Sequence, residues 1–249
     1  MTDTFTPPTR FAIPGRIAVP QTSETTWQPA VIAGIRRETP RASTFRLAVP
    51  TWPGHVPGQH LMLRLTAEDG YTAQRHYSLA SAPDDSGHIE LTLDHVADGE
   101  VSGHLHRVAR AGDTVEVRGP VSGFFAWPGD RPALLLGAGS GVVPLMSMLR
   151  HRRRRGLDVP LRLVVSARTP EELIYADEYG DETLPVLTRV PGGGRLSAAH
   201  LEPFLHGPER PDGGWEAYVC GSNAFAEHAS RLLVTLGQPV DRIRIERFG

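Results

Sequence analysis

Four short stretches of the sequence combine residue types that bind nucleotides or handle protons. An arginine, a tyrosine and a serine lie close together at Arg75, Tyr77 and Ser78. An aromatic ring can stack on a planar ligand, a hydroxyl can bond its edge, and a guanidinium can hold a phosphate. The other stretches supply backbone amides, a thiol and a carboxylate: Gly137-Ala-Gly-Ser-Gly141, Cys220-Gly221 and Glu246-Arg-Phe248. The pattern at 75–78 also fits an ordinary edge strand with a solvent-facing arginine, so the interpretation depends on the order and context of all four stretches.

The glycine-rich stretch follows an apolar run and precedes a helix signal. The run 133–136 predicts a buried strand, and a proline soon after the glycines suits the first turn of a helix. The spacing Gly137-x-Gly139-x-Gly141 is not the GxGxxG of a dinucleotide fingerprint. A strand, a glycine turn and a helix still let backbone amides around Ser140 approach a pyrophosphate. The alternative is a flexible connection without a ligand.

The end of the next predicted strand, 161–167, bears on the choice of nucleotide. An NAD site usually has an acidic residue there, which bonds the ribose hydroxyls, whereas an arginine accommodates the 2′-phosphate of NADP. Here the residues are Ser166 and Arg168, and the first acid is Glu171. The sequence therefore favours NADP, with NAD as the open alternative.

The bulk composition is that of a globular protein. The 249 residues are 40% hydrophobic and 22% charged, and the net charge is −2. This balance gives no reason to expect nucleic-acid binding or attraction to an anionic membrane. No apolar run is long enough to span a bilayer, and residues 1–19 lack the apolar core of a signal peptide, so we expect a cytoplasmic protein.

Cys220 is the one cysteine of the sequence. Disulfides within the chain are therefore excluded, and so are a Cys-rich zinc site and a plant-type iron–sulfur cluster, which need several thiolates. The 11 histidines show no metal-binding spacing, so we expect no metal.

The spacing of hydrophobic residues divides the chain into an arm and two domains. Residues 1–26 are rich in Thr and Pro, which predicts a mobile arm. Residues 27–129 alternate short strands with turn signals, which predicts an antiparallel β-barrel. Residues 130–249 alternate strands with helices, which predicts an α/β domain with a doubly wound parallel sheet. Within it we expect a helix over 170–179 and a strand over 186–190.

In this order, over about 27–249, the motifs resemble those of the ferredoxin–NADP reductase family. The resemblance implies a flavin-binding barrel, an NAD(P)-binding α/β domain, and FAD as the cofactor. Arg75 and Tyr77 correspond to contacts with the flavin phosphate and the isoalloxazine ring, and Ser78 corresponds to a serine near the reactive N5. The family's second flavin motif, in which backbone amides at a helix start bind the pyrophosphate, resembles Gly99-Glu-Val101-Ser102. A simple N-cap at Ser102 is the alternative.

The same resemblance assigns the nicotinamide side. The family's dinucleotide turn corresponds to Gly137, Gly139, Ser140 and Gly141, and its adenosine end to Ser166 and Arg168. Cys220, followed by Gly221, corresponds to a cysteine beside the nicotinamide C4. Glu246 corresponds to an acid near the hydride path, and Phe248 to an aromatic that covers the flavin. The resemblance therefore implies catalytic roles for Ser78, Cys220 and Glu246.

The resemblance also implies an enzyme that takes hydride from NADPH onto FAD. It would pass electrons singly to a separate protein, such as a ferredoxin, a flavodoxin or an oxygenase component. A quinone-type small-molecule acceptor is the enzymatic alternative, and a non-catalytic flavin or nucleotide sensor is the alternative from another class. The basic run 150–155 is a candidate docking patch for an acidic carrier, although dipole complementarity and solvation also explain it. The aromatic residues within 124–127 are predicted to pack between the domains.

Overall fold

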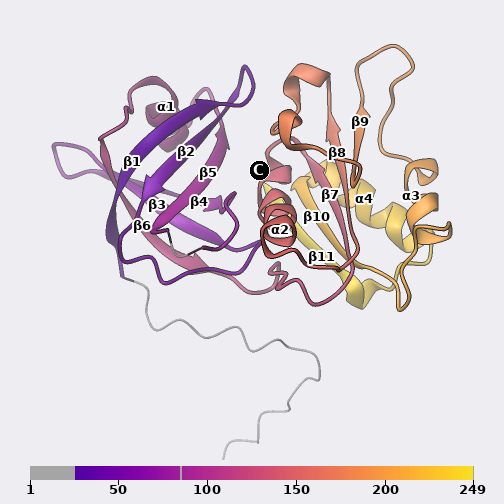
Figure 1. Cartoon of the computed structure of the whole chain (residues 1–249). Helices are drawn as coiled ribbons and strands as arrows, with labels where there is room; N and C mark the ends of the chain where they lie inside the picture. The colour runs from indigo at the N-terminus through magenta and orange to yellow at the C-terminus, as the bar shows by residue number, and fades with distance from the viewer. Residues whose placement is uncertain (1–25, 85, 249) are drawn as a thin grey trace, which may run out of the picture.

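The computed structural model describes residues 26–84 and 86–248, which form two halves side by side (Figure 1). The predicted arm, 1–26, lies outside the described residues except for Thr26. The first half is built on a six-stranded antiparallel sheet and the second on a five-stranded parallel sheet. Residues 122–132 connect the two sheets, and the predicted domain boundary at 129/130 falls in this connection.

The antiparallel sheet has the strand order β4-β3-β6-β1-β2-β5. Its strands are β1 (Gln28–Arg37), β2 (Ala42–Ala48), β3 (His60–Thr66), β4 (Thr72–Ser78), β5 (His88–Asp94) and β6 (Thr114–Val121). An isolated bridge between Leu79 and Leu91 brings the two edges together, so the sheet curls into a barrel that is not fully closed. The predicted antiparallel barrel is confirmed.

Alternating burial explains these strands and their core. On β1, Ala30 and Ile32 are fully buried while Val31 between them is exposed. Inward-facing residues of this kind from all the strands meet in one apolar core. Helix α1 (Glu100–Arg107) packs on that core through Val101 and Leu105.

The parallel sheet has the order β11-β10-β7-β8-β9. Its strands are β7 (Ala133–Ala138), β8 (Leu161–Ala167), β9 (Thr183–Leu187), β10 (Glu216–Ser222) and β11 (Ile243–Phe248). Helix α2 (Val142–Arg155) covers one face, and α3 (Ala198–Leu205) and α4 (Asn223–Thr235) cover the other. The near-complete burial of β7 follows from this double cover. The predicted doubly wound sheet is confirmed.

The strand order places a ligand site. The chain adds β8 and β9 on one side of β7, then returns to add β10 and β11 on the other. The carboxyl ends of β7 and β10 therefore border a topological switch point, where ligands of open parallel sheets bind.

The predicted helix over 170–179 is wrong. The segment contains two separate 3-10 turns, Pro170–Glu172 and Ala176–Glu178. Between them Leu173 is extended and Tyr175 has a left-handed φ of 65°. Ile174 and Tyr175 are each 3% exposed, so burial of their side chains overrides the helical pattern. The predicted strand 186–190 overlaps β9 at 186–187 alone, and the chain then turns away. Within the described part of the chain, no helix is long and apolar enough to cross a membrane.

Candidate active site between the two sheets

Strands from both sheets bring together four residues with polar side chains. His60 on β3 lies directly opposite Ser78 on β4. Cys220 on β10 is the partner of Glu246 on β11. The two pairs meet at the junction of the halves, where His60 Nδ1 lies 4.0 Å from Glu246 Oε1. The structure therefore assembles one cluster from residues far apart in sequence.

The acid and the base of this cluster are both driven toward their neutral forms. Burial raises the pKa of Glu246 to about 7. Burial, and the nearby His76 ring with its centroid 5.1 Å away, lower the pKa of His60 to about 4. Between these two pH values the carboxyl is protonated and the imidazole is neutral. The contact is then a neutral pair, in which a proton can be held or exchanged, and no ion pair forms.

Cys220 is fully buried. Burial, with Glu246 beside it, raises the pKa of its thiol well above the ordinary value, so the sulfur is a neutral, compact side chain and no nucleophile. Its backbone touches the glycine turn: a Cβ on Gly141 would lie 2.2 Å from the Cys220 carbonyl oxygen. Gly141 is therefore required by this close approach.

Two buried polar atoms of the cluster point to a ligand. Ser78 Oγ and Glu246 Oε2 have no hydrogen-bond partner among the residues that the structure describes. Buried polar atoms are usually satisfied, so the polar edge of a bound molecule at this junction would complete them. A flavin ring, which carries hydrogen-bonding groups along its edge, fits this requirement. Phe248 is half-buried and packs against the core under α2.

Arg75 and the start of α1 converge on a second place, next to the cluster. Arg75 Nη2 lies 3.7 Å from Glu100 Oε2, and Tyr71 donates to Glu100 Oε1 at 2.9 Å. An arginine that faces a helix N-terminus is a combination able to bind a phosphate, and in this structure the Glu100 carboxylate pairs with the guanidinium. Tyr77 is half-buried against the barrel core, and burial raises its pKa to about 12, so the phenol stays neutral.

The alternative of an N-cap at Ser102 is wrong. The N-cap of α1 is Gly99, and Ser102 lies buried within the first turn. A Cβ on Gly99 would come within 2.3 Å of Ser102 Oγ, so this glycine lets the serine turn back onto the helix start. The Val101 side chain faces the barrel core, so its backbone amide is the group that could contact a ligand.

A pocket of about 520 Å³ lies at the switch point of the parallel sheet. Most of the residues predicted for the nicotinamide dinucleotide line it: Gly139, Ser140, Gly141, Ser166, Arg168 and Gly221. Phe248, the residue predicted to cover the flavin, lines it as well. Gly137 lies in β7 and Cys220 in β10, and the next residue of each strand lines the pocket. Gly137 serves packing, because a Cβ there would lie 2.9 Å from Leu145 Cδ1 and 3.1 Å from Val142 Cα.

Sequence reasoning missed several charged or titratable residues of the site: Arg41, Asp94, Glu172, Arg195 and His228 of the pocket, and His60 of the cluster. Arg195 lines the pocket from the loop after β9, and Arg41 lines it from the β1–β2 turn of the other half. The glycines just before Arg195 were the available signal for a loop near a ligand. Arg41 and His60 gave no signal, because they reach the site through the arrangement of the two halves.

The aromatic stretch packs between the halves in part. Phe125 meets Tyr218 edge to face with ring centroids 5.4 Å apart, and Trp127 is 1% exposed. Both belong to the core under α2, which confirms the prediction for them. Phe124 instead is 66% exposed.

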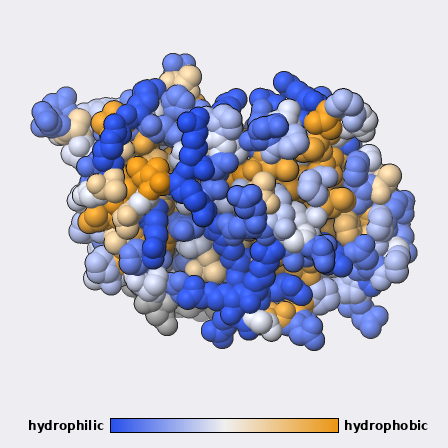
Figure 2. All heavy atoms as spheres, turned by 45° about the horizontal axis from the view of Figure 1, so that its top comes forward, coloured by the Kyte–Doolittle hydropathy of each residue, from blue (hydrophilic) through white to orange (hydrophobic). Residues whose placement is uncertain are grey.

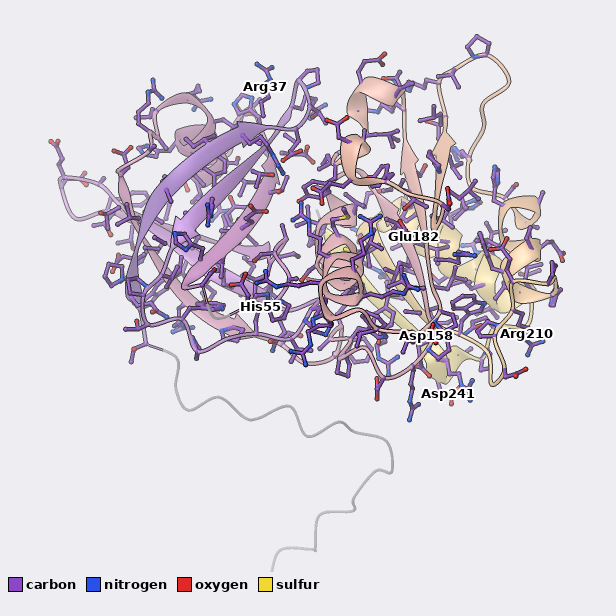
Figure 3. The ribbon with its side chains drawn as sticks, viewed as in Figure 1. Arg37, His55, Asp158, Glu182, Arg210 and Asp241 are labelled. Carbon is purple, nitrogen blue, oxygen red and sulfur yellow. The ribbon has the colours of Figure 1, made fainter. Side chains whose placement is uncertain are left out.

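Most arginines of the basic run 150–155 form ion pairs with acidic residues of the same chain. Arg150 binds Glu178 and Glu90, Arg153 binds Glu182 (labelled in Figure 3), and Arg154 binds Asp84 at 2.6 Å. Hydrophilic side chains gather across the middle of the face in Figure 2, over the junction of the two halves. The run therefore contributes to the structure, which weakens the idea of a free docking patch.

Comparison with known proteins agrees with this arrangement. Residues 32–126 match the family profile described as the oxidoreductase FAD-binding domain. A solved ferredoxin NADP⁺ reductase from Neisseria gonorrhoeae with bound FAD and NADP superposes with a TM-score of 0.74 at 23% identity, over 90% of this chain and 99% of that one. This likeness shows the fold.

Two curated relatives share more of the sequence. The ferredoxin reductase component of a 3-ketosteroid-9-alpha-monooxygenase from Mycolicibacterium smegmatis is 31% identical over 78% of this chain and 56% of its own length. The chain thus spans about half the length of this relative. Ferredoxin--NADP reductase B from Sorangium cellulosum is 32% identical over 77% of this chain and 84% of its own length. The chain belongs to the ferredoxin–NADP reductase family of FAD-binding oxidoreductases.

Proposed function

We propose that the chain is an NAD(P)H-dependent FAD oxidoreductase that passes electrons to a separate protein acceptor. The observation that carries this proposal is the junction cluster, where Ser78 and His60 of one sheet face Cys220 and Glu246 of the other. The cluster adjoins a nucleotide-sized pocket at the switch point of the parallel sheet. A junction of this kind suits two cofactors that must meet edge to edge.

The residues of the antiparallel half would hold FAD. Arg75 and the amides of 99–102 would bind its phosphates, as the place formed by Arg75 and the start of α1 supports. Tyr77 and Phe248 would stack on the ring from opposite sides, and Ser78 Oγ would bond its edge. When bound, FAD supplies the redox chemistry: acceptance of hydride from reduced nicotinamide and release of single electrons.

The chain's own residues would manage protons and exclude water. Protonated Glu246 can donate at Oε2, the atom left without a partner, while neutral His60 can accept at Nδ1. The buried Cys220 thiol fills space beside the nicotinamide without adding charge. These roles need no charged group next to the reacting atoms, in keeping with a dry junction.

The pocket would hold the dinucleotide. The turn at 139–141 would meet the pyrophosphate with its amides, and Ser166 and Arg168 would face the adenosine end. Within the described residues, Arg168 pairs with Glu172 at 3.8 Å, and both side chains are partly exposed, so a phosphate can compete for the guanidinium. Arg195 adds a second guanidinium, which favours the 2′-phosphate of NADPH over NADH.

The acceptor is best sought among protein carriers, because relatives carry names such as the M. smegmatis ferredoxin reductase component. The test is anaerobic reoxidation of the reduced protein by ferredoxins, flavodoxins and oxygenase components, with quinones alongside. Fast reoxidation by at least one protein carrier, slowed by salt, supports the proposal. Fast reoxidation by quinones with every protein carrier slow would make it a small-molecule reductase, and a protein that no reductant changes would be a sensor.

A further inference from the structure

The segment 168–178 touches both halves of the molecule. Its first part lines the pocket through Arg168, Glu172 and Ile174. Its second part reaches the antiparallel sheet, where Tyr175 contacts Thr92 on β5. The pocket-lining residues and the residue that contacts the antiparallel sheet lie in one short stretch without a regular helix. The position of this stretch therefore depends on these contacts.

A chain of hydrogen bonds runs from Tyr175 into the antiparallel sheet. Tyr175 Oη lies 2.5 Å from Thr92 Oγ1, which lies 2.6 Å from Thr44 Oγ1 on β2. Thr44 Oγ1 lies 2.5 Å from Glu38 Oε1. Each hydroxyl carries a single proton and a carboxylate accepts, so Thr44 donates to Glu38, Thr92 to Thr44, and Tyr175 to Thr92. All three hydroxyl residues are buried, so the chain is shielded from water.

Arg150 on α2 holds the same segment from another side. Its side chain is 15% exposed, and its guanidinium bonds Glu178 at 2.9 and 2.5 Å. It also bonds Glu90 at 3.1 Å and the Ala80 carbonyl at 2.9 Å, both in the antiparallel half. Its Cζ lies 4.6 Å from the centroid of the Tyr175 ring. One partly buried cation thus joins the segment to the other half.

The far end of the hydrogen-bond chain lies at the part of the pocket that the first half lines. Glu38 begins the β1–β2 turn, from which Thr39 and Arg41 line the pocket. At the near end, Tyr175 keeps a left-handed backbone, which a residue other than glycine adopts only where its surroundings fix it. The chain therefore connects a constrained residue in one wall to the turn that forms the other.

We propose that Tyr175, Thr92, Thr44 and Arg150 are positioning residues for the nucleotide. They tie the 168–178 wall of the pocket to the β1–β2 wall and keep the pocket in its binding shape. The inference rests on the proposed function, because it takes the pocket as the nucleotide site. Without the tie, the segment spends part of its time elsewhere, and the apparent affinity falls with the fraction of molecules that have a formed pocket.

Two variants with nearly unchanged volume test the tie. Tyr175→Phe and Thr92→Val each remove a hydroxyl, and neither residue lines the pocket. In the FAD-loaded protein, we expect each to weaken equilibrium binding of NADP⁺ or NAD⁺ by about three- to tenfold, the effect of a lost hydrogen bond. The double variant should bind as Thr92→Val does, because both changes break the same bond. Amide exchange within 168–178 should become faster in each variant, while FAD content stays unchanged.

Arg154→Ala is the matched control. Arg154 lies on the same helix and also reaches the antiparallel half, but its ion pair with Asp84 involves no residue of 168–178. This variant should bind nucleotide as the unaltered protein does. Full affinity in both hydroxyl variants, or an equal loss in Arg154→Ala, overturns the proposal. No nucleotide binding by the unaltered protein overturns the proposed function and this inference with it.

Discussion

Replacing Glu246 with glutamine should remove a loss of folding stability that the unaltered protein undergoes as the pH rises. Burial raises the pKa of Glu246 from its ordinary 4.5 to about 7. At about 1.4 kcal/mol for each pH unit, ionisation is about 3 kcal/mol less favourable in the folded protein than in the unfolded chain. The side chain is 22% exposed, so solvent screens only a small part of this cost.

The sign follows from proton binding. The unfolded chain releases this proton near pH 4.5 and the folded protein near pH 7. Between these values the unfolded chain binds fewer protons, so the folded state loses stability as the pH rises, and the loss is complete above pH 7. Glu246→Gln keeps the shape but cannot ionise. The free energy of unfolding of Glu246→Gln, relative to that of the unaltered protein, should therefore rise by about 3 kcal/mol between about pH 4.5 and about pH 8.

The assay is urea unfolding of the protein without flavin, followed by tryptophan fluorescence at the two pH values. Glu227→Gln is the control, because Glu227 is exposed on α4 and pairs with Arg231. The effect of Glu227→Gln on the free energy of unfolding should change by less than about 0.5 kcal/mol between the two pH values. A pH-independent difference between Glu246→Gln and the unaltered protein would refute the view of Glu246 as a buried neutral acid.

Three further predictions concern the cofactor places. Arg75→Ala should lose FAD on desalting and keep its far-UV circular dichroism, because Arg75 is exposed at the phosphate place and fills no core volume; full retention of the visible spectrum would contradict its role. Arg168→Ala should lower the preference for NADPH over NADH about ten- to a hundredfold in kcat/KM, the effect of a lost charged hydrogen bond, whereas equal losses with both nucleotides would make Arg168 structural. Gly141→Ala should destabilise the parallel sheet strongly in thermal unfolding, because its Cβ would lie 2.2 Å from the Cys220 carbonyl oxygen. Gly156→Ala, at φ 58° with open space around it, should cost only about 1 kcal/mol, and similar effects of the two substitutions would contradict the close approach.

Both sheets and the unit of strand, glycine turn and helix at 133–155 could be predicted from the sequence. The strands of the barrel alternate with period two, and β7 is an apolar run directly before glycines, so local patterns suffice. Cys220 and Glu246 lie at the ends of neighbouring parallel strands, which places them at one edge of the sheet. These features depend on short-range rules that hold in most proteins.

Other features arise from long-range contacts and carry no local signal. The helical pattern of 170–179 is overruled by the burial of Ile174 and Tyr175 and by the contact of Tyr175 with Thr92 of the other half. His60 is one residue of an ordinary strand, and it becomes part of the site because β11 of the second sheet brings Glu246 to within 4.0 Å. Most arginines of the basic run 150–155 are paired within the fold, because acidic partners approach from segments distant in sequence, as Asp84 does for Arg154.

The visible spectrum of the FAD-loaded protein, mixed anaerobically with NADPH, tests the central claim most directly. If FAD and the nucleotide meet at the junction of Ser78, His60, Cys220 and Glu246, NADPH should bleach the flavin absorbance in a single rapid phase. Adding an electron-accepting protein should then restore the oxidised spectrum. A protein that binds FAD but whose spectrum stays unchanged with both NADPH and NADH would contradict the account.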